Sequence, residues 1–139
     1  MGKKYDFEYI VVGSGPAGST AAFNLAKAKK RVTLVEGRFF GGTNLNTRNI
    51  PYDVALDFSH TYRKLLSLPE FQNQDFTFSL PAAVSHQLKT VLSCGGNDKK
   101  PFEAAGITCL SGYANFLDPN TIVVNGQKHT AHNFILATG

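Results

Sequence analysis

Apolar residues in the first quarter of the chain form two short runs separated by an alanine-rich segment. The first run, Tyr9 to Val12, is continuous and partly β-branched, which is typical of a strand buried on both faces of a parallel sheet. The segment from Pro16 onward is rich in alanine and ends in a cluster of lysines, which predicts a helix. The second run, Val32 to Val35, again has the pattern of a buried strand. Strand, helix and strand in this order predict a βαβ unit.

The middle of the chain is expected to be helical and the last third rich in strands. Helical periodicity extends from about 44 to 68, with Pro51 expected to break or kink it, and returns over 81–93. The turn-forming residues at 95–101 are interpreted as a linker. Further strands are expected at 107–110, 113–117, 121–125 and 127–131, with the hairpin dipeptide Asn125-Gly126 between two of them, and an apolar run at 134–137 closes the chain. We therefore predict an α/β fold: a doubly wound, Rossmann-type parallel sheet with a short antiparallel β-meander.

A glycine-rich motif joins the first predicted strand to the first predicted helix. The sequence Gly13-Ser14-Gly15-Pro16-Ala17-Gly18 has the GxGxxG spacing, and Glu36 ends the next strand 23 positions after the first glycine. In this context the glycines allow a tight turn, a close approach of pyrophosphate to the backbone and close helix–strand packing. A carboxylate at the end of the second strand accepts hydrogen bonds from a ribose 2′-hydroxyl and repels a 2′-phosphate. The motif therefore predicts a dinucleotide site suited to NAD or FAD, without choosing between them.

Composition excludes several other classes of protein. The 139 residues contain 14 Lys and Arg against 10 Asp and Glu, and the net charge of +4 is too small and too dispersed for a nucleic-acid partner. No apolar run approaches the length of a membrane span, so no membrane association is expected. The two cysteines, Cys94 and Cys109, form no disulfide framework, and the pair His129 and His132 lacks a third metal ligand, so no metal site is expected. These features favour a soluble protein of a reducing, cytoplasmic compartment.

Four separated motifs resemble those of the FAD-dependent pyridine nucleotide–disulfide oxidoreductases, which include dihydrolipoamide dehydrogenase, glutathione reductase and mercuric reductase. They are the glycine motif with Glu36, the segment Gly41 to Pro51, the segment Gly112 to Phe116, and the closing Ala137-Thr138-Gly139. The resemblance implies FAD as the cofactor and, for the full-length protein, NAD(P)H as reductant and a homodimeric assembly. The implied cofactor-binding residues are Gly13, Ser14, Gly15, Pro16, Ala17, Gly18, Glu36, Gly37, Gly42, Thr43, Tyr113, Ala114, Ala137, Thr138 and Gly139.

The chain departs from the family pattern at the positions that carry redox chemistry. The family reads Gly-Gly-Thr-Cys at the start of the second motif, and its two redox cysteines correspond to Asn44 and Asn49 here. The family's lysine two residues after the proline corresponds to Asp53. Because a carboxamide is neither a nucleophile nor a redox couple, the dithiol route is not expected to operate at this site, and no catalytic residue is assigned.

Length is the second departure, because family chains usually continue for several hundred residues with nicotinamide and dimerisation domains. Residues 1–139 are therefore expected to be an incomplete N-terminal FAD-binding fragment that is inactive alone. The leading hypothesis is the FAD-binding portion of a flavin oxidoreductase that passes hydride from NAD(P)H to an unknown acceptor without the dithiol. A non-catalytic dinucleotide-binding module or degenerate paralogue is the alternative. A Rossmann domain that binds NAD without flavin is a weaker third reading.

Overall fold

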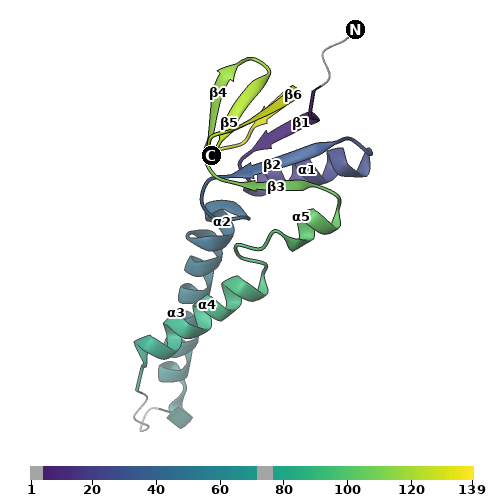
Figure 1. Ribbon diagram of the computed structural model, residues 1–139. Coiled ribbons are helices and arrows are strands. Elements are labelled where there is room, and N and C mark those ends of the chain that lie inside the picture. Colours follow the sequence, from purple (N-terminus) through teal and green to yellow (C-terminus); the bar gives the residue numbers. More distant parts are fainter. Residues whose placement is uncertain (1–4, 72–76) are drawn as a thin grey trace.

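The computed structural model describes residues 5–71 and 77–139, and a six-stranded sheet organises them (Figure 1). The strands are β1 (Phe7–Val12), β2 (Val32–Glu36), β3 (Thr108–Ser111), β4 (Ala114–Asp118), β5 (Thr121–Val124) and β6 (Gln127–Leu136). Their order across the sheet is β3-β2-β1-β6-β5-β4, with β3, β2, β1 and β6 parallel to one another and β4 and β5 antiparallel. The predicted α/β fold, a doubly wound parallel sheet with an antiparallel meander, is confirmed.

The parallel sheet has a different cover on each face. Helix α1 (Pro16–Lys27) and the short helix α5 (Lys100–Ala104) pack on one face, where Ala22 and Phe102 join Val11 and Leu34 in a buried cluster. The meander folds over the opposite face, where its residues pack with the other side of the central strands. That second cluster consists of Ile10, Val35, Ile122, Val124 and Ala131. Both faces of β1 and β2 are therefore covered, which is why these strands have continuous apolar sequences.

Strand β6 belongs to both parts of the sheet. Its first half pairs with β5, from Thr121 opposite Thr130 to Val124 opposite Gln127, and its second half runs parallel to β1, with Val12 opposite Leu136. The sequence predicted a strand over 127–131, separate from the closing apolar run 134–137; the structure corrects this, because one strand extends from Gln127 to Leu136. The intervening His132 and Asn133 continue the extended backbone because β1 offers a hydrogen-bonding edge just beyond the end of β5.

A helical arm projects from one end of the sheet (Figure 1). It contains α2 (Gly42–Asn46), α3 (Asn49–Ser67), the 3₁₀ turn η1 (Pro69–Phe71) and α4 (Leu80–Ser93), with α3 and α4 packed side by side. The predicted helix over 44–68 is interrupted at Thr47 and Arg48 and not at Pro51, which lies in the first turn of α3. Proline is tolerated there because the first N–H groups of a helix have no intrahelical partner.

The segment 95–101 is not a linker, which corrects the sequence interpretation. The backbone N–H of Asn97 donates to the carbonyl of Phe40 at 3.0 Å, and the Asn97 side-chain oxygen accepts from the Phe40 N–H at 3.2 Å. Helix α5 then begins at Lys100 and buries Phe102 against Phe23, with the two rings stacked 5.0 Å apart. The segment therefore attaches the end of α4 to the body of the domain. Within the described parts of the chain, no helix is long and apolar enough to cross a membrane.

Candidate functional site

The glycine turn between β1 and α1 is built around the end of β6. Gly13 has a φ of 101°, and a Cβ atom on it would lie 2.2 Å from the backbone oxygen of Ala137. A Cβ on Gly18 would lie 1.8 Å from the Gly13 oxygen. The Ala137 N–H in turn donates to the Val12 carbonyl at 2.8 Å. These close approaches bring the first and the last sequence motifs into one structure, a contact that the glycine spacing alone does not predict.

The start of α1 faces open space. Gly15 is the N-cap residue, no side chain caps the helix, and Pro16 occupies its first turn. A Cβ atom on Gly15 would meet nothing within 4 Å, in contrast to Gly13 and Gly18. The first N–H groups of a helix lack intrahelical partners and carry partial positive charge. This end of α1 can therefore receive an anionic group without displacing a side chain.

Glu36 is tied to the glycine turn by Ser14. The Ser14 hydroxyl donates to Glu36 Oε2 at 2.6 Å, and the Ser14 N–H donates to the same oxygen at 2.9 Å. The other carboxylate oxygen, Oε1, accepts the N–H of Arg38 at 2.8 Å. Ser14 also accepts the N–H of Gly41 at 3.1 Å, which connects the β1–α1 turn to the loop that precedes α2.

An arginine and a tyrosine meet at the exposed rim beside Glu36. The Arg38 Nε donates to the Tyr113 hydroxyl at 3.3 Å. The Tyr113 ring covers Gly37 so closely that a Cβ atom on that glycine would lie 2.8 Å from two ring carbons. The two side chains thus join the loop after β2 to the turn before β4. Sequence reasoning assigned no role to Arg38, although its place two residues after Glu36 was a signal.

These elements surround a pocket of about 600 Å³. It is lined by Val12, Gly13, Ser14, Gly15, Pro16, Ala17, Val35, Glu36, Gly37, Arg38, Phe39, Gly42, Thr43, Asn44, Thr47, Gly112, Tyr113, Ala114, Ala137, Thr138 and Gly139. Every residue that the sequence predicted to bind cofactor is in this lining except Gly18, which packs beneath the turn. The predicted site residues do not include Val12, Val35, Arg38, Phe39 or Thr47, and Gly112 was placed in a motif without being assigned a cofactor contact. The first two are ends of buried strands, a position that could have indicated them.

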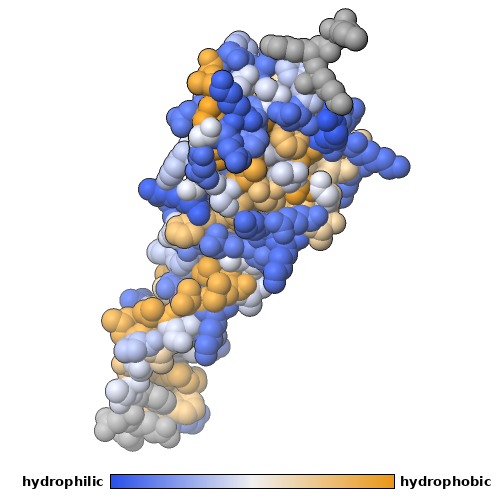
Figure 2. Space-filling model, viewed as in Figure 1, coloured by the Kyte–Doolittle hydropathy of each residue, from blue (hydrophilic) through white to orange (hydrophobic). Residues whose placement is uncertain are grey.

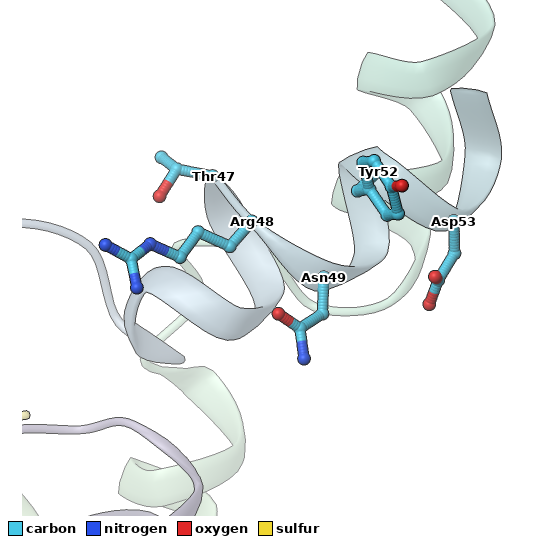
Figure 3. A pocket seen from close by; sticks show the side chains of 5 residues that line it. All are labelled: Thr47, Arg48, Asn49, Tyr52 and Asp53. Atoms are coloured by element: carbon cyan, nitrogen blue, oxygen red, sulfur yellow. The ribbon is translucent and has the colours of Figure 1, made fainter. Parts of the chain in front are cut away.

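A second, shallower hollow of about 520 Å³ lies where α2 gives way to α3 (Figure 3). Thr47, Arg48, Asn49, Tyr52 and Asp53 line it, and Thr47 also lines the larger pocket, so the two adjoin. Asn49 and Asp53 are four residues apart and project to the same side of α3. Asn44 instead lines the larger pocket. These side chains can donate or accept hydrogen bonds, but they contain no thiol.

Comparison with known protein families identifies the family of this chain. Residues 7–139 match the family model described as pyridine nucleotide-disulphide oxidoreductase. The chain belongs to this family. Members of the pyridine nucleotide-disulphide oxidoreductase family are flavin-dependent oxidoreductases that use pyridine nucleotides.

Individual relatives agree with this assignment. The chain is 32% identical over 138 residues to the dihydrolipoyl dehydrogenase of Geobacillus stearothermophilus, covering 95% of this chain and 29% of that protein. It is 26% identical to the mercuric reductase of Bacillus cereus, covering 97% of this chain and 22% of the relative. The HOCl-induced flavoprotein disulfide reductase RclA from Escherichia coli, in its Cu(II) complex, superposes with a TM-score of 0.74 at 21% identity and supports the fold; 94% of this chain and 27% of RclA are covered. The chain thus spans about 30% of the length of the dihydrolipoyl dehydrogenases of Geobacillus stearothermophilus and Mycoplasma pneumoniae.

The residues of the larger pocket fit the dinucleotide part of the family's cofactor. The uncapped start of α1 and the open space over Gly15 suit a pyrophosphate group. The Oε1 atom of Glu36 accepts a single hydrogen bond within the described structure and so retains an acceptor site for a ribose hydroxyl. The fit therefore extends over both the charged and the hydroxylated parts of such a ligand.

The cysteines lie away from both hollows. Cys94 is exposed at the C-terminal end of α4, and Cys109 is half-buried on β3; neither lines the pockets. Burial, with a smaller contribution from Glu103, raises the pKa of the Cys109 thiol, which disfavours the reactive thiolate. Over residues 5–71 and 77–139, no group of three potential metal ligands comes together, and His129 and His132 gain no third partner of that kind.

Proposed function

We propose that this chain is the FAD-binding part of an oxidoreductase that passes hydride from NAD(P)H to an acceptor other than a protein dithiol. The observation that carries the proposal is the combination of a pocket whose lining fits a dinucleotide with Asn44 on that lining and Asn49 in the adjoining hollow. FAD, when bound, accepts and donates hydride by its own chemistry. The residues of the chain then have only to hold, orient and shield it.

The proposed division of roles follows the chemistry of each group. The N–H groups at the start of α1 bind the pyrophosphate, with Gly15 leaving room for it. Glu36 accepts a hydrogen bond from the adenosine ribose. Gly42 and Thr43 lie along the pyrophosphate and ribitol side, the backbone at Tyr113 and Ala114 meets the adenine, and Ala137-Thr138-Gly139 closes over the cofactor. Asn44 contributes a hydrogen-bonding carboxamide where the family has a thiol.

A spectrum of the full-length protein tests this proposal. We expect flavin absorption that is bleached by NADH or NADPH under anaerobic conditions, followed by reoxidation with a quinone or a dye. A bound flavin that neither reductant bleaches would contradict the oxidoreductase function. That result would favour the second candidate, a module that holds FAD without catalysis. This candidate is supported by Asn44, Asn49 and Asp53, which stand where the family has its two redox cysteines and a lysine.

The rest of the proposal concerns the whole protein. We propose that residues 1–139 form one dinucleotide-binding domain of a longer protein and are inactive alone, since the relatives are about three times as long. The two free cysteines are consistent with a reducing, cytoplasmic location. The basic cluster at the end of α1 suits the negative end of the helix dipole, and the net charge is only +4, so no nucleic-acid partner is proposed.

An exposed apolar stripe on α4 supports a homodimer. Leu80, Val84, Leu88 and Leu92 recur every fourth residue, and each is more than half exposed. Hydrophobic surface of this kind extends along the arm in Figure 2. Lys89 is the only charged residue between 80 and 93, so two such helices can approach without many buried charges. Mutual burial of these stripes, with Phe78 beside them, covers on the order of 1,000 Å², the lower limit for a specific interface.

A further inference from the structure

Ser14 is the most completely engaged polar residue of the pocket. It is fully buried, with 0% of its surface exposed. Its N–H and hydroxyl both donate to Glu36 Oε2, at 2.9 and 2.6 Å, while the hydroxyl oxygen accepts the Gly41 N–H at 3.1 Å. One small side chain therefore links the glycine turn, the end of β2 and the loop before α2. The 2.6 Å contact is the short distance typical of a hydroxyl donating to a carboxylate.

These contacts decide which oxygen of Glu36 is available to a ligand. A carboxylate oxygen has about two acceptor sites. The two donors from Ser14 fill Oε2, whereas Oε1 accepts only the Arg38 N–H at 2.8 Å among the described residues. Oε1 is thus the oxygen with an acceptor site to spare in the pocket.

The nearest cation in sequence is directed elsewhere. Arg38 Nε donates to the Tyr113 hydroxyl at 3.3 Å. All the hydrogen-bond donors that Glu36 has in the described part of the chain are neutral: two from Ser14 and one backbone N–H. Among the described residues no cation therefore pairs with this carboxylate, although an arginine lies two residues away.

We propose that Ser14 is a positioning residue for ligand selection: it holds the Glu36 carboxylate away from the Arg38 guanidinium. In that position the carboxylate accepts a hydrogen bond from a free ribose hydroxyl and repels a phosphate on the same ribose. Without the Ser14 hydroxyl, Oε2 loses its shortest hydrogen bond, and the carboxylate turns toward Arg38. The resulting ion pair neutralises the charge that excludes a phosphorylated ribose. This inference rests on the dinucleotide pocket of the proposed function.

The test compares two probes on the full-length protein after removal of bound nucleotide. ADP carries a free 2′-hydroxyl, and adenosine 2′,5′-bisphosphate carries a phosphate there. Competition of each probe against FAD, followed by flavin fluorescence, gives its dissociation constant at this pocket and not at a nicotinamide site. We expect the wild type to prefer ADP and Ser14→Ala to reduce that preference by about tenfold, the effect of losing one hydrogen bond to a charged group. Ser14→Thr, which restores a hydroxyl, should recover most of the preference.

Two further variants separate positioning from general damage. In a Glu36→Gln background, Ser14→Ala should change the preference less than twofold, because the hydroxyl acts through the carboxylate. Thr20→Ala is the control, because it removes a hydroxyl of α1 that donates to the Pro16 carbonyl at 2.7 Å and not to Glu36. This variant should leave the preference for ADP unchanged. The inference is overturned if Ser14→Ala leaves the preference unchanged, or if it reduces the preference equally in the wild type and in the Glu36→Gln protein. Either result leaves the proposed dinucleotide pocket standing. A wild type that binds neither probe nor FAD overturns the dinucleotide pocket, and this inference with it.

Discussion

At the scale of single residues, the three motif glycines have distinct physical roles. Gly13 adopts a positive φ and lies against the Ala137 backbone, Gly18 lies against the Gly13 carbonyl, and Gly15 faces open space. The GxGxxG spacing predicted the turn and the helix start, because both are local. It could not predict that the wall opposite Gly13 is supplied by Ala137, since that contact depends on how β6 enters the sheet.

Substituting Gly13 by alanine should therefore reduce the stability of the fold, whereas substituting Gly15 should reduce the affinity for FAD. Gly13→Ala should destabilise the fold by roughly 2–4 kcal/mol, because it combines left-handed strain with a clash against backbone. Gly15→Ala should leave the thermal midpoint nearly unchanged and weaken FAD binding, since its methyl group enters the space assigned to pyrophosphate. Thermal unfolding and flavin fluorescence titration give both quantities. Equal stability losses in the two variants would contradict the assignment.

Asp6 contributes to stability in a pH-dependent way. Its Oδ2 atom accepts the Thr130 hydroxyl at 2.7 Å and the Thr130 N–H at 2.9 Å, and these bonds lower its pKa below the ordinary value of 3.8. Because the folded form binds the proton less readily than the unfolded chain, this stability is fully present above pH 3.8 and is lost as the pH falls through the lowered pKa.

Urea unfolding of the wild type and Asp6→Asn over pH 2 to 7 measures this contribution. The difference in unfolding free energy between the two proteins should shrink as the pH falls below 3.8. Glu8 also has a lowered pKa, because the Arg31 N–H and then Lys30 bind its carboxyl. Since Glu8 is present in both proteins, its pH-dependent contribution cancels in their difference. A difference that is constant over the whole pH range would contradict the role of Asp6.

At the scale of elements, local sequence predicted what neighbouring residues determine. The bounds of β1, α1 and β2 were close, and the Asn125-Gly126 hairpin is confirmed, with φ of 49° and 80° at the two positions. The linker interpretation of 95–101 failed because Gly, Asn and Lys give the same turn signal whether a segment is free or packed. The contact of Asn97 with Phe40, 57 positions earlier in the chain, has no local signature.

Helix α5 should prove to be part of the domain's core. Phe102 is 6% exposed and packs between Phe23 and Phe40. Phe102→Ala should lower the free energy of unfolding by roughly 3 kcal/mol through the cavity it leaves. Lys100→Ala, in the same helix but exposed, should change it by less than about 0.5 kcal/mol. Denaturant unfolding followed by circular dichroism measures both. A negligible effect of Phe102→Ala would restore the linker interpretation.

At the scale of the whole molecule, the proposed dimer surface lies on helix α4 of the arm, whereas the pocket lies at the glycine turn of the sheet. Leu88 lies in the α4 stripe and is 59% exposed. Leu88→Glu in the full-length protein should shift a dimer toward monomer, because two buried carboxylates would face each other across the contact. Leu117→Glu, at a similarly exposed leucine on β4, is the matched control and should remain dimeric. Analytical ultracentrifugation distinguishes the two, and a Leu88→Glu protein that stays fully dimeric would remove the stripe from the interface.

The position of β6 between β1 and β5 also determines when the pocket can exist during synthesis. β1, α1 and β2 are made first, and they can pair as a local unit that leaves one edge of β1 open. That edge is filled by residues of β6, and the wall beside Gly13 is supplied by Ala137, about 100 residues after Glu36. At 5–20 residues per second, a ribosome needs about 5–20 s to make that interval. Throughout this time the glycine turn lacks its wall, so the proposed dinucleotide pocket is complete only after the strand that closes it has emerged.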